Sequence, residues 1–149
     1  MRVILSVDPG SKNIGLAKSD PLGIGATALC VIPHVQMEKD AQAIAEKARE
    51  CGAEAILVGQ PLDEDGSAGP KARHSAKLAE TIRRYFEGEV FLYDEYGSTK
   101  AARAIFKEMG VRRSRRLGHL DANAAAVILQ NYLDELSYQH PALPTEEDE

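Results

Sequence analysis

The sequence predicts an α/β fold in which a five-stranded mixed sheet carries helices on both faces. Short apolar runs rich in β-branched residues recur along the chain, and each is too short to be a helix. The first three runs are joined by short turns, whereas the later runs alternate with segments whose apolar residues repeat at helical spacing. Strands joined by short turns pair antiparallel and strands joined through helices pair parallel, so one sheet is expected to contain both arrangements.

The first three strands are expected to form an antiparallel meander. Residues 3–7 are apolar and β-branched, and the Pro-Gly-Ser sequence at 9–11 predicts a turn. Proline presets φ for such a turn and glycine tolerates positive φ. Residues 12–18 then run back beside the first strand, and a second turn leads to a third strand at 26–32.

Helices and strands alternate in the rest of the chain. A helix is expected at 37–51, with acidic residues early and basic residues late as the helix dipole favours, and Gly52 ends it. Residues 55–58 are continuously apolar, as in a strand covered on both faces. The remaining expected elements are a loop at 59–69, a helix from 70 to 86, a strand at 90–93, a helix capped by Ser98 and ended by Gly110, an arginine-rich loop at 111–118 and a helix at 120–136.

The bulk composition predicts one domain at 1–136, followed by an acidic, disordered tail at 137–149. The formal net charge is −5, but four carboxylates end the chain, so the residues before them carry only −1. No apolar run approaches the roughly 18 residues that span a bilayer, and no signal peptide is evident, so a cytoplasmic protein without a membrane partner is expected. Cys30 and Cys51 form no metal-ligand pattern and are expected to be reduced, mostly buried thiols.

Three carboxylates are expected near one edge of the sheet. Asp8 and Glu95 follow two strands, and Asp121 lies in the first turn of the last helix, on its apolar stripe. Such a cluster is costly unless a cation joins it, and an oxygen-rich site suits Mg²⁺ or Mn²⁺. Two such ions about 4 Å apart are a common apparatus for phosphodiester hydrolysis.

Each of these acids also has a simpler explanation when it is taken alone. Asp8 stands before Pro-Gly and is a natural turn former, Glu95 is a natural solvated loop acid, and Asp121 is favoured by the helix dipole. Two further acids, Asp20 and Asp94, are expected to have structural roles. Only the three together indicate a metal site.

Four motifs, in this order, are shared with a known family: Val7-Asp8-Pro9-Gly10-Ser11-Lys12-Asn13-Ile14-Gly15 with Ser19-Asp20-Pro21-Leu22-Gly23; Val58-Gly59-Gln60-Pro61-Leu62 with Asp65-Gly66-Ser67; Asp94-Glu95 with Ser98-Thr99; and Leu120-Asp121-Ala122 leading to Ala125-Ala126-Val127-Ile128-Leu129-Gln130 and Tyr132-Leu133. Through them the chain resembles, over residues 2–136, the YqgF (RuvX-like) family of the RNase H-like superfamily, whose members are named as pre-16S rRNA nucleases and Holliday junction resolvases. The resemblance implies an RNase H-like fold with strand order 3-2-1-4-5 and a metal triad of Asp8, Glu95 and Asp121. It also implies action on structured nucleic acid.

The chain departs from the family pattern at a few positions. Asn13 stands where the family usually has arginine, and Tyr96-Gly97 stand where it usually has Arg-Leu. One helical turn after Asp121, where some related resolvases carry a fourth ligand, the chain has alanine. His119 is a candidate substitute ligand or proton-transfer group, although a loop histidine without a role is the simpler explanation. The departures bear on substrate preference and rate more than on the type of reaction.

A basic cluster is expected to hold the substrate. Arg112, Arg113, Arg115 and Arg116 lie in the loop before the helix that begins with Asp121, and Lys12 lies in the first turn. Such residues neutralise backbone phosphates. The alternative is a solvated loop that balances the acidic tail. Aromatic residues are scarce and tryptophan is absent, so recognition is expected to use backbone and shape rather than base stacking.

The sequence therefore predicts a divalent-metal-dependent nuclease acting on structured nucleic acid, with processing of the 5′ end of pre-16S rRNA as the leading role. The alternatives are a Holliday junction resolvase acting on branched DNA and a catalytically silent nucleic-acid-binding module. The Asp8-x-Gly10 opening also occurs in two-domain ATP-binding proteins of the actin and sugar-kinase kind, but this chain supplies only one domain. Both a monomer and a homodimer are compatible with the sequence.

Overall fold

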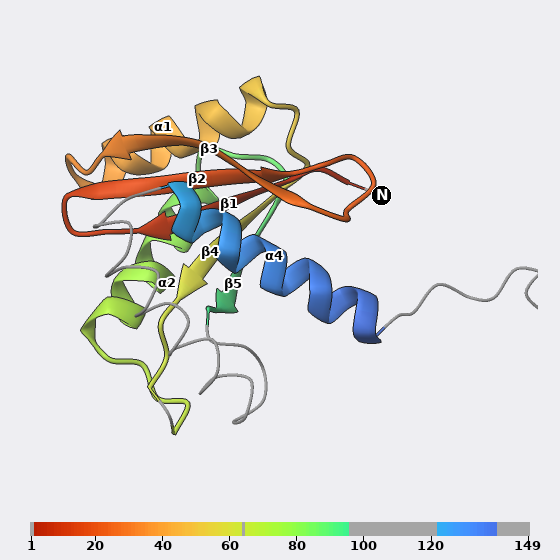
Figure 1. Ribbon diagram of the computed structural model, residues 1–149. Coiled ribbons are helices and arrows are strands. Elements are labelled where there is room, and N and C mark those ends of the chain that lie inside the picture. The colour runs from red at the N-terminus through yellow and green to blue at the C-terminus, as the bar shows by residue number, and fades with distance from the viewer. Residues whose placement is uncertain (1, 64, 96–121, 140–149) are drawn as a thin grey trace, which may run out of the picture.

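Five strands form one mixed sheet, with helices packed on both of its faces (Figure 1). The computed structural model describes residues 2–63, 65–95 and 122–139. The strands are β1 (Ile4–Pro9), β2 (Asn13–Ser19), β3 (Ala26–Pro33), β4 (Ala55–Gln60) and β5 (Glu89–Asp94), and the helices are α1 (Met37–Glu50), α2 (Pro70–Ile82) and α4 (Ala122–Gln139). The helix expected after Ser98 and the arginine-rich loop at 111–118 lie outside the described residues.

The strand order is β3-β2-β1-β4-β5, which confirms the expected order 3-2-1-4-5. The three strands of the meander pair antiparallel, and β1 with β4 and β4 with β5 pair parallel. The carboxyl ends of β1, β4 and β5 consequently lie at one edge of the sheet, called the carboxyl edge below. The opposite edge holds the starts of β4 and β5 and is called the amino edge.

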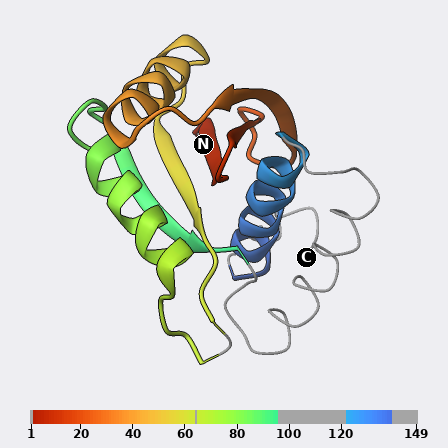
Figure 2. The same ribbon diagram turned by 90° about the vertical axis from the view of Figure 1, so that its left-hand side faces the viewer.

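Successive side chains of a strand point to opposite faces of the sheet, so the apolar residues of the strands pack in two separate cores. Leu5 and Val7 of β1 pack in the core under α1 and α2, whereas Ile4 packs in the core under α4. Figure 2 shows the resulting layers, with α1 and α2 on one side of the sheet and α4 on the other. The two cysteines are free and only partly buried. Among the helices that the structure describes, none is long and apolar enough to cross a bilayer.

Strands β1 and β4 extend two residues further at their carboxyl ends than the apolar pattern indicates. The sequence predicts a strand over 3–7, but β1 continues through Asp8 and Pro9, which still pair with β2. In the same way β4 continues through Gly59 and Gln60, which pair with β5 and which the sequence assigns to a loop. The backbone ladder does not require apolar side chains, so polar residues and glycine at a strand's end escape a periodicity argument.

The ends of two helices also differ from the prediction. The sequence extends the second helix to 86, but α2 ends at Ile82, after which the Tyr85 and Phe86 amides both donate to the Ile82 carbonyl in a tight turn. Phe86 still packs in the core from this turn. The last helix continues to Gln139 rather than ending at 136, so the tail predicted from 137 begins inside its last turn. No helix-breaking residue precedes Pro141, which explains the extension.

The turn between β1 and β2 requires glycine at position 10. A Cβ placed on Gly10 would lie 2.2 Å from the backbone oxygen of Asn13, which no real structure accommodates without moving the turn. We expect Gly10→Ala to destabilise the protein by about 1–3 kcal/mol, as overpacking against backbone does. Urea unfolding measures this change.

Gly25→Ala is the matched control for that measurement. The nearest atom to a Cβ on Gly25 is a flexible side-chain oxygen of Asp20 at 3.4 Å, an ordinary contact. We expect a change within about 0.5 kcal/mol there. Equal losses in the two variants would mean that the close approach in the first turn is unimportant.

Candidate metal and nucleic-acid site

Asp8 lies at the carboxyl edge, and strand alternation directs it to the α4 side of the sheet. Ile4 and Ser6, the preceding residues of the same parity, both contact the α4 side. In the ladder with β2, Asp8 pairs with Gly15, so the neighbour across the strand has no side chain. Asp8 itself is half-buried. The Asp8 carboxylate therefore lies at the solvent-accessible end of the core between the sheet and α4.

Glu95 follows β5 and reaches the same side of the sheet. Its backbone amide donates to the Gln60 carbonyl at 3.3 Å, which continues the β4–β5 pairing by one step. Its Oε2 lies 3.4 Å from the position that a Cβ on Gly59 would occupy. Since β4 lies between β1 and β5, Asp8 and Glu95 flank Gly59 on adjacent strands, with backbones about 10 Å apart by strand spacing.

Gly59 leaves the space between these two carboxylates unfilled. A Cβ there would also lie 3.0 Å from Ile128 Cδ1 and 3.4 Å from the Val7 carbonyl oxygen. A side chain at this position would thus press on α4 and on the Glu95 carboxylate together. Gly15 and Gly59 lie on the strands on either side of Asp8 and carry no side chains, so an ion and a phosphate can approach Asp8 closely. The space formed by Asp8, Gly15 and Gly59 is called the cradle below.

Helix α4 is fixed on the sheet beside this cradle. Ala125 is fully buried, Ile128 is 6% exposed and Tyr132 packs on Phe91 and Tyr93. The predicted sheet-facing stripe of the last helix is therefore confirmed for its described members. Asp121 precedes the first residue of α4 and lies outside the described residues, and so do four predicted phosphate-binding residues, Arg112, Arg113, Arg115 and Arg116.

The structure thus brings Asp8 and Glu95 to one edge and one face, and leaves the third member of the predicted triad untested. Within the described ranges, no group of three His, Cys, Asp or Glu residues gathers as a metal site. Lys12 is the only predicted phosphate-binding residue in these ranges, and it is exposed at the tip of the first turn. That tip lies at the carboxyl edge, directly beyond Asp8.

A buried serine links α4 to β1 next to the cradle, and the sequence argument missed it. Ser6 is fully buried, and its Oγ donates to the Ala125 carbonyl at 2.8 Å across 119 residues of sequence. A single hydroxyl within an apolar strand is the signal that points to such a bond. The bond fixes the amino-terminal part of α4 two residues from Asp8.

We expect Ser6→Ala to lower the free energy of unfolding by about 1 kcal/mol, because a buried hydrogen bond between distant segments is lost. Urea unfolding checks this value. Ser75→Ala is the control, since Ser75 is equally buried but bonds only to the Lys71 carbonyl within α2. A helix tolerates that loss because alanine is the better helix former, so we expect little or no destabilisation. An equal loss of stability in Ser75→Ala would show that burial of the serine, rather than its hydrogen-bond partner, determines the change in unfolding free energy.

Two titratable groups near the sheet have shifted pKa values with clear causes. Backbone amides of Gly25 and Ile24 donate to the Asp20 carboxylate and hold its pKa below the ordinary value, which agrees with a structural role. Asp20 therefore stabilises the fold above its ordinary pKa, and this contribution is lost as the pH falls. Burial, followed by the Glu135 carboxylate, raises the pKa of Tyr93, so this phenol beside the candidate site stays protonated.

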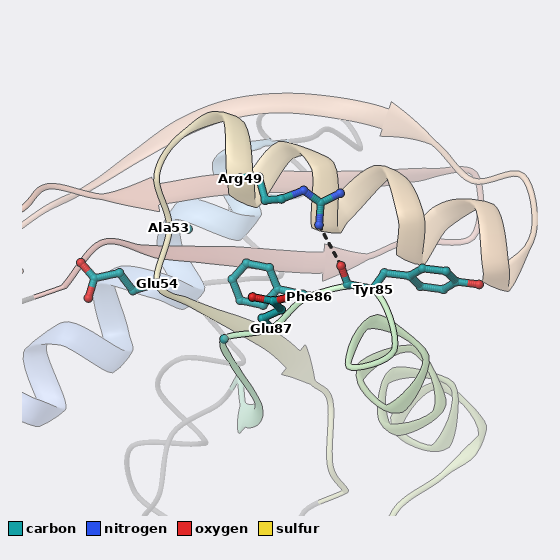
Figure 3. A pocket seen from close by; sticks show the side chains of 7 residues that line it. Arg49, Ala53, Glu54, Tyr85, Phe86 and Glu87 are labelled. Carbon is teal, nitrogen blue, oxygen red and sulfur yellow. Dashed lines mark hydrogen bonds between the residues drawn. The ribbon is translucent and has the colours of Figure 1, made fainter.

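A surface hollow at the amino edge is a different feature (Figure 3). Arg49, at its rim, donates to the Tyr85 carbonyl at 2.8 Å, and Glu54 and Gly88 line it where β4 and β5 begin. It thus lies at the opposite end of the sheet from Asp8 and Glu95. Its lining includes no predicted site residue.

Comparison with known proteins matches nearly the whole chain. A family model described as "RuvX: Holliday junction resolvase" matches residues 2–135. A protein of Clostridium perfringens named "Putative pre-16S rRNA nuclease" is 38% identical over 134 residues, covering 90% of this chain and 98% of that protein. A protein of the same name from Symbiobacterium thermophilum is 39% identical over 135 residues, covering 91% of this chain and 94% of that protein.

Solved structures show a similar fold at low sequence identity. Thermus thermophilus RuvC in complex with a Holliday junction substrate is 16% identical, with a TM-score of 0.59 over 97% of this chain and all of that chain. The fowlpox virus Holliday junction resolvase is also 16% identical, with a TM-score of 0.52 over 89% of this chain and 99% of that chain. These similarities confirm the expected RNase H-like fold.

Proposed function

Since this chain belongs to the RuvX family, we propose that it is a divalent-metal-dependent nuclease acting on structured nucleic acid, with the 5′ end of pre-16S rRNA as its leading substrate. The family and the curated relatives are nucleases, which are hydrolases acting on phosphodiester bonds, so the expected enzyme class is confirmed. The identity of the metal-binding residues, of the metal and of the substrate is what we propose here.

One observation carries the proposal: Asp8 and Glu95 flank a side-chain-free position on the strand between them. Oxygen donors at the ends of the two strands that flank β4 suit Mg²⁺ or Mn²⁺, and Gly59 gives a cation and a phosphate room to approach. Asp8, Glu95 and Asp121 would hold the metal. When bound, Mg²⁺ or Mn²⁺ supplies an activated water and stabilises the leaving oxygen.

The chain's own residues bind and orient the substrate around that centre. Lys12 stands at the turn beyond Asp8 and is placed to contact a backbone phosphate. Arg112, Arg113, Arg115 and Arg116 add a second set of phosphate contacts in the proposal. The rigid β1 and β5 ends fix the two carboxylates, and the Ser6 bond fixes α4 beside them.

The substrate is tested by offering both kinds to one preparation. RNA spanning the 5′ boundary of 16S rRNA and a four-way DNA junction are incubated with the protein in Mg²⁺ and in Mn²⁺. We expect cleavage of the RNA, and preferential cleavage of the junction would support the resolvase alternative, which the family description and the RuvC-like fold favour. Binding without cleavage of either substrate would support a silent binding module instead.

A further inference from the structure

A histidine–aspartate pair closes the corner between β3 and α1. His34 Nδ1 is hydrogen-bonded to Asp40 Oδ2, and Asp40 Oδ1 accepts a bond of 2.9 Å from the Val35 amide. The Asp40 side chain is only 3% exposed, whereas the His34 side chain is 31% exposed. Burying a carboxylate is costly unless it is fully paired, so Asp40 fixes the ring of His34 in one orientation.

This orientation leaves the second ring nitrogen available. Nε2 of His34 makes no hydrogen bond to any residue in the ranges that the structure describes. When His34 is protonated, the pair is a salt bridge whose outer N–H faces away from Asp40. A carboxylate behind an imidazole is a common way to orient its other nitrogen toward a ligand. Neither the metal site nor the first turn uses this group.

Two further basic side chains come from neighbouring elements. The His34 amide donates to the Lys12 carbonyl at 2.9 Å, which joins the corner to the first turn. His74 of α2 lies with its ring 6.1 Å from that of His34, edge to face. Two imidazoles therefore lie at one corner, and an imidazole N–H donates to an anion such as a phosphate. The Asp40 carboxylate is already paired with His34 and Val35, so an incoming anion can pair with the outer nitrogen of His34.

The distance from this corner to the proposed metal site is short enough for one nucleic acid to reach both. Asp8 pairs with Gly15, Gly15 pairs with Val31, and His34 follows three residues later. Two strand spacings across and three residues along give a separation of about 14 Å from Asp8. A nucleic acid lying across the carboxyl edge therefore reaches both places.

We propose that His34, oriented by Asp40 and accompanied by His74 and Lys12, binds a backbone phosphate of the nucleic acid about 14 Å from the proposed metal centre. This inference rests on the proposed nuclease function, because that function supplies the nucleic acid. It assigns a substrate contact to the α1–α2 side of the sheet.

The decisive variant is His34→Asn. The asparagine Nδ2 replaces His34 Nδ1 as donor to Asp40, so the corner stays locked while the outer nitrogen and its charge are removed. Binding of the structured RNA is measured by titration without divalent metal. We expect the affinity to fall about tenfold. The slope of log affinity against log salt is expected to fall by about 0.7–0.9.

Two further variants make every outcome decisive. His74→Gln alters an exposed ring, so folding is unaffected and a smaller loss of affinity is expected even if His34→Asn fails to fold. Arg49→Gln removes one positive charge at the amino edge and is expected to leave the affinity unchanged. If both histidine variants keep the wild-type affinity and salt slope while RNA cleavage is intact, the proposed phosphate contact is wrong and the proposed nuclease function is unaffected. Absence of RNA binding by the wild type would instead overturn the proposed function.

Discussion

Asp8→Asn is expected to abolish cleavage while leaving the fold and nucleic-acid binding in place. Asparagine keeps the shape of Asp8 but removes the negative charge that a divalent cation requires at the end of β1. Loss of a residue that merely supports a metal ligand typically costs 10–100-fold in activity or metal affinity, so loss of a ligand is expected to cost about a hundredfold or more. Single-turnover cleavage of the RNA in Mn²⁺ measures the change.

A thermal-shift titration with Mn²⁺ reports the same loss without relying on cleavage. A cation at ten times its dissociation constant stabilises the wild type by about 1.4 kcal/mol. We expect this stabilisation to disappear in Asp8→Asn and to be retained in Asp20→Asn. Asp20 is the matched control because its carboxylate is used by the Gly25 and Ile24 amides of a turn. Full cleavage by purified Asp8→Asn would contradict the proposed mechanism.

The part of the fold that sequence predicts well is the part set by local periodicity. Residues 3–7 and 55–58 indicate strands because their apolar runs are short, and the helix at 37–51 is indicated by its 3.6-residue repeat. The order of the strands required the family resemblance, since several orders satisfy the same local patterns. Alternation along β1 and β5 then suffices to put Asp8 and Glu95 on one face.

Contacts between distant segments are what the sequence leaves open. The Ser6 bond to Ala125 joins residues that no local rule relates, and the buried pair of His34 and Asp40 depends on how β3 meets α1. Gly59 belongs to a recognisable motif, but the loop assignment concealed its place inside β4. Its effect on the Glu95 carboxylate becomes visible only when β5 is laid beside it.

The arginine cluster is the second feature whose removal is expected to have a large effect. Changing Arg112, Arg113, Arg115 and Arg116 together to glutamine removes four positive charges and keeps side-chain length. Each phosphate contact contributes about 0.9 to the salt slope on duplex substrate and about 0.7 on single strands. If all four residues contact phosphates, the slope is expected to fall by about 3–4, and the affinity at low salt by several hundredfold or more.

A control variant that removes positive charge elsewhere separates contact from general attraction. Lys47 and Arg49 lie in the last turn of α1 and Arg84 follows α2, and their joint change to glutamine removes three positive charges. Long-range attraction is screened beyond about 10 Å at 0.1 M salt, so these residues are expected to affect the slope little. An unchanged slope in the four-arginine variant would assign that loop to balancing the acidic tail. A fall confined to that variant would support its contact with the strand delivered to Asp8 and Glu95.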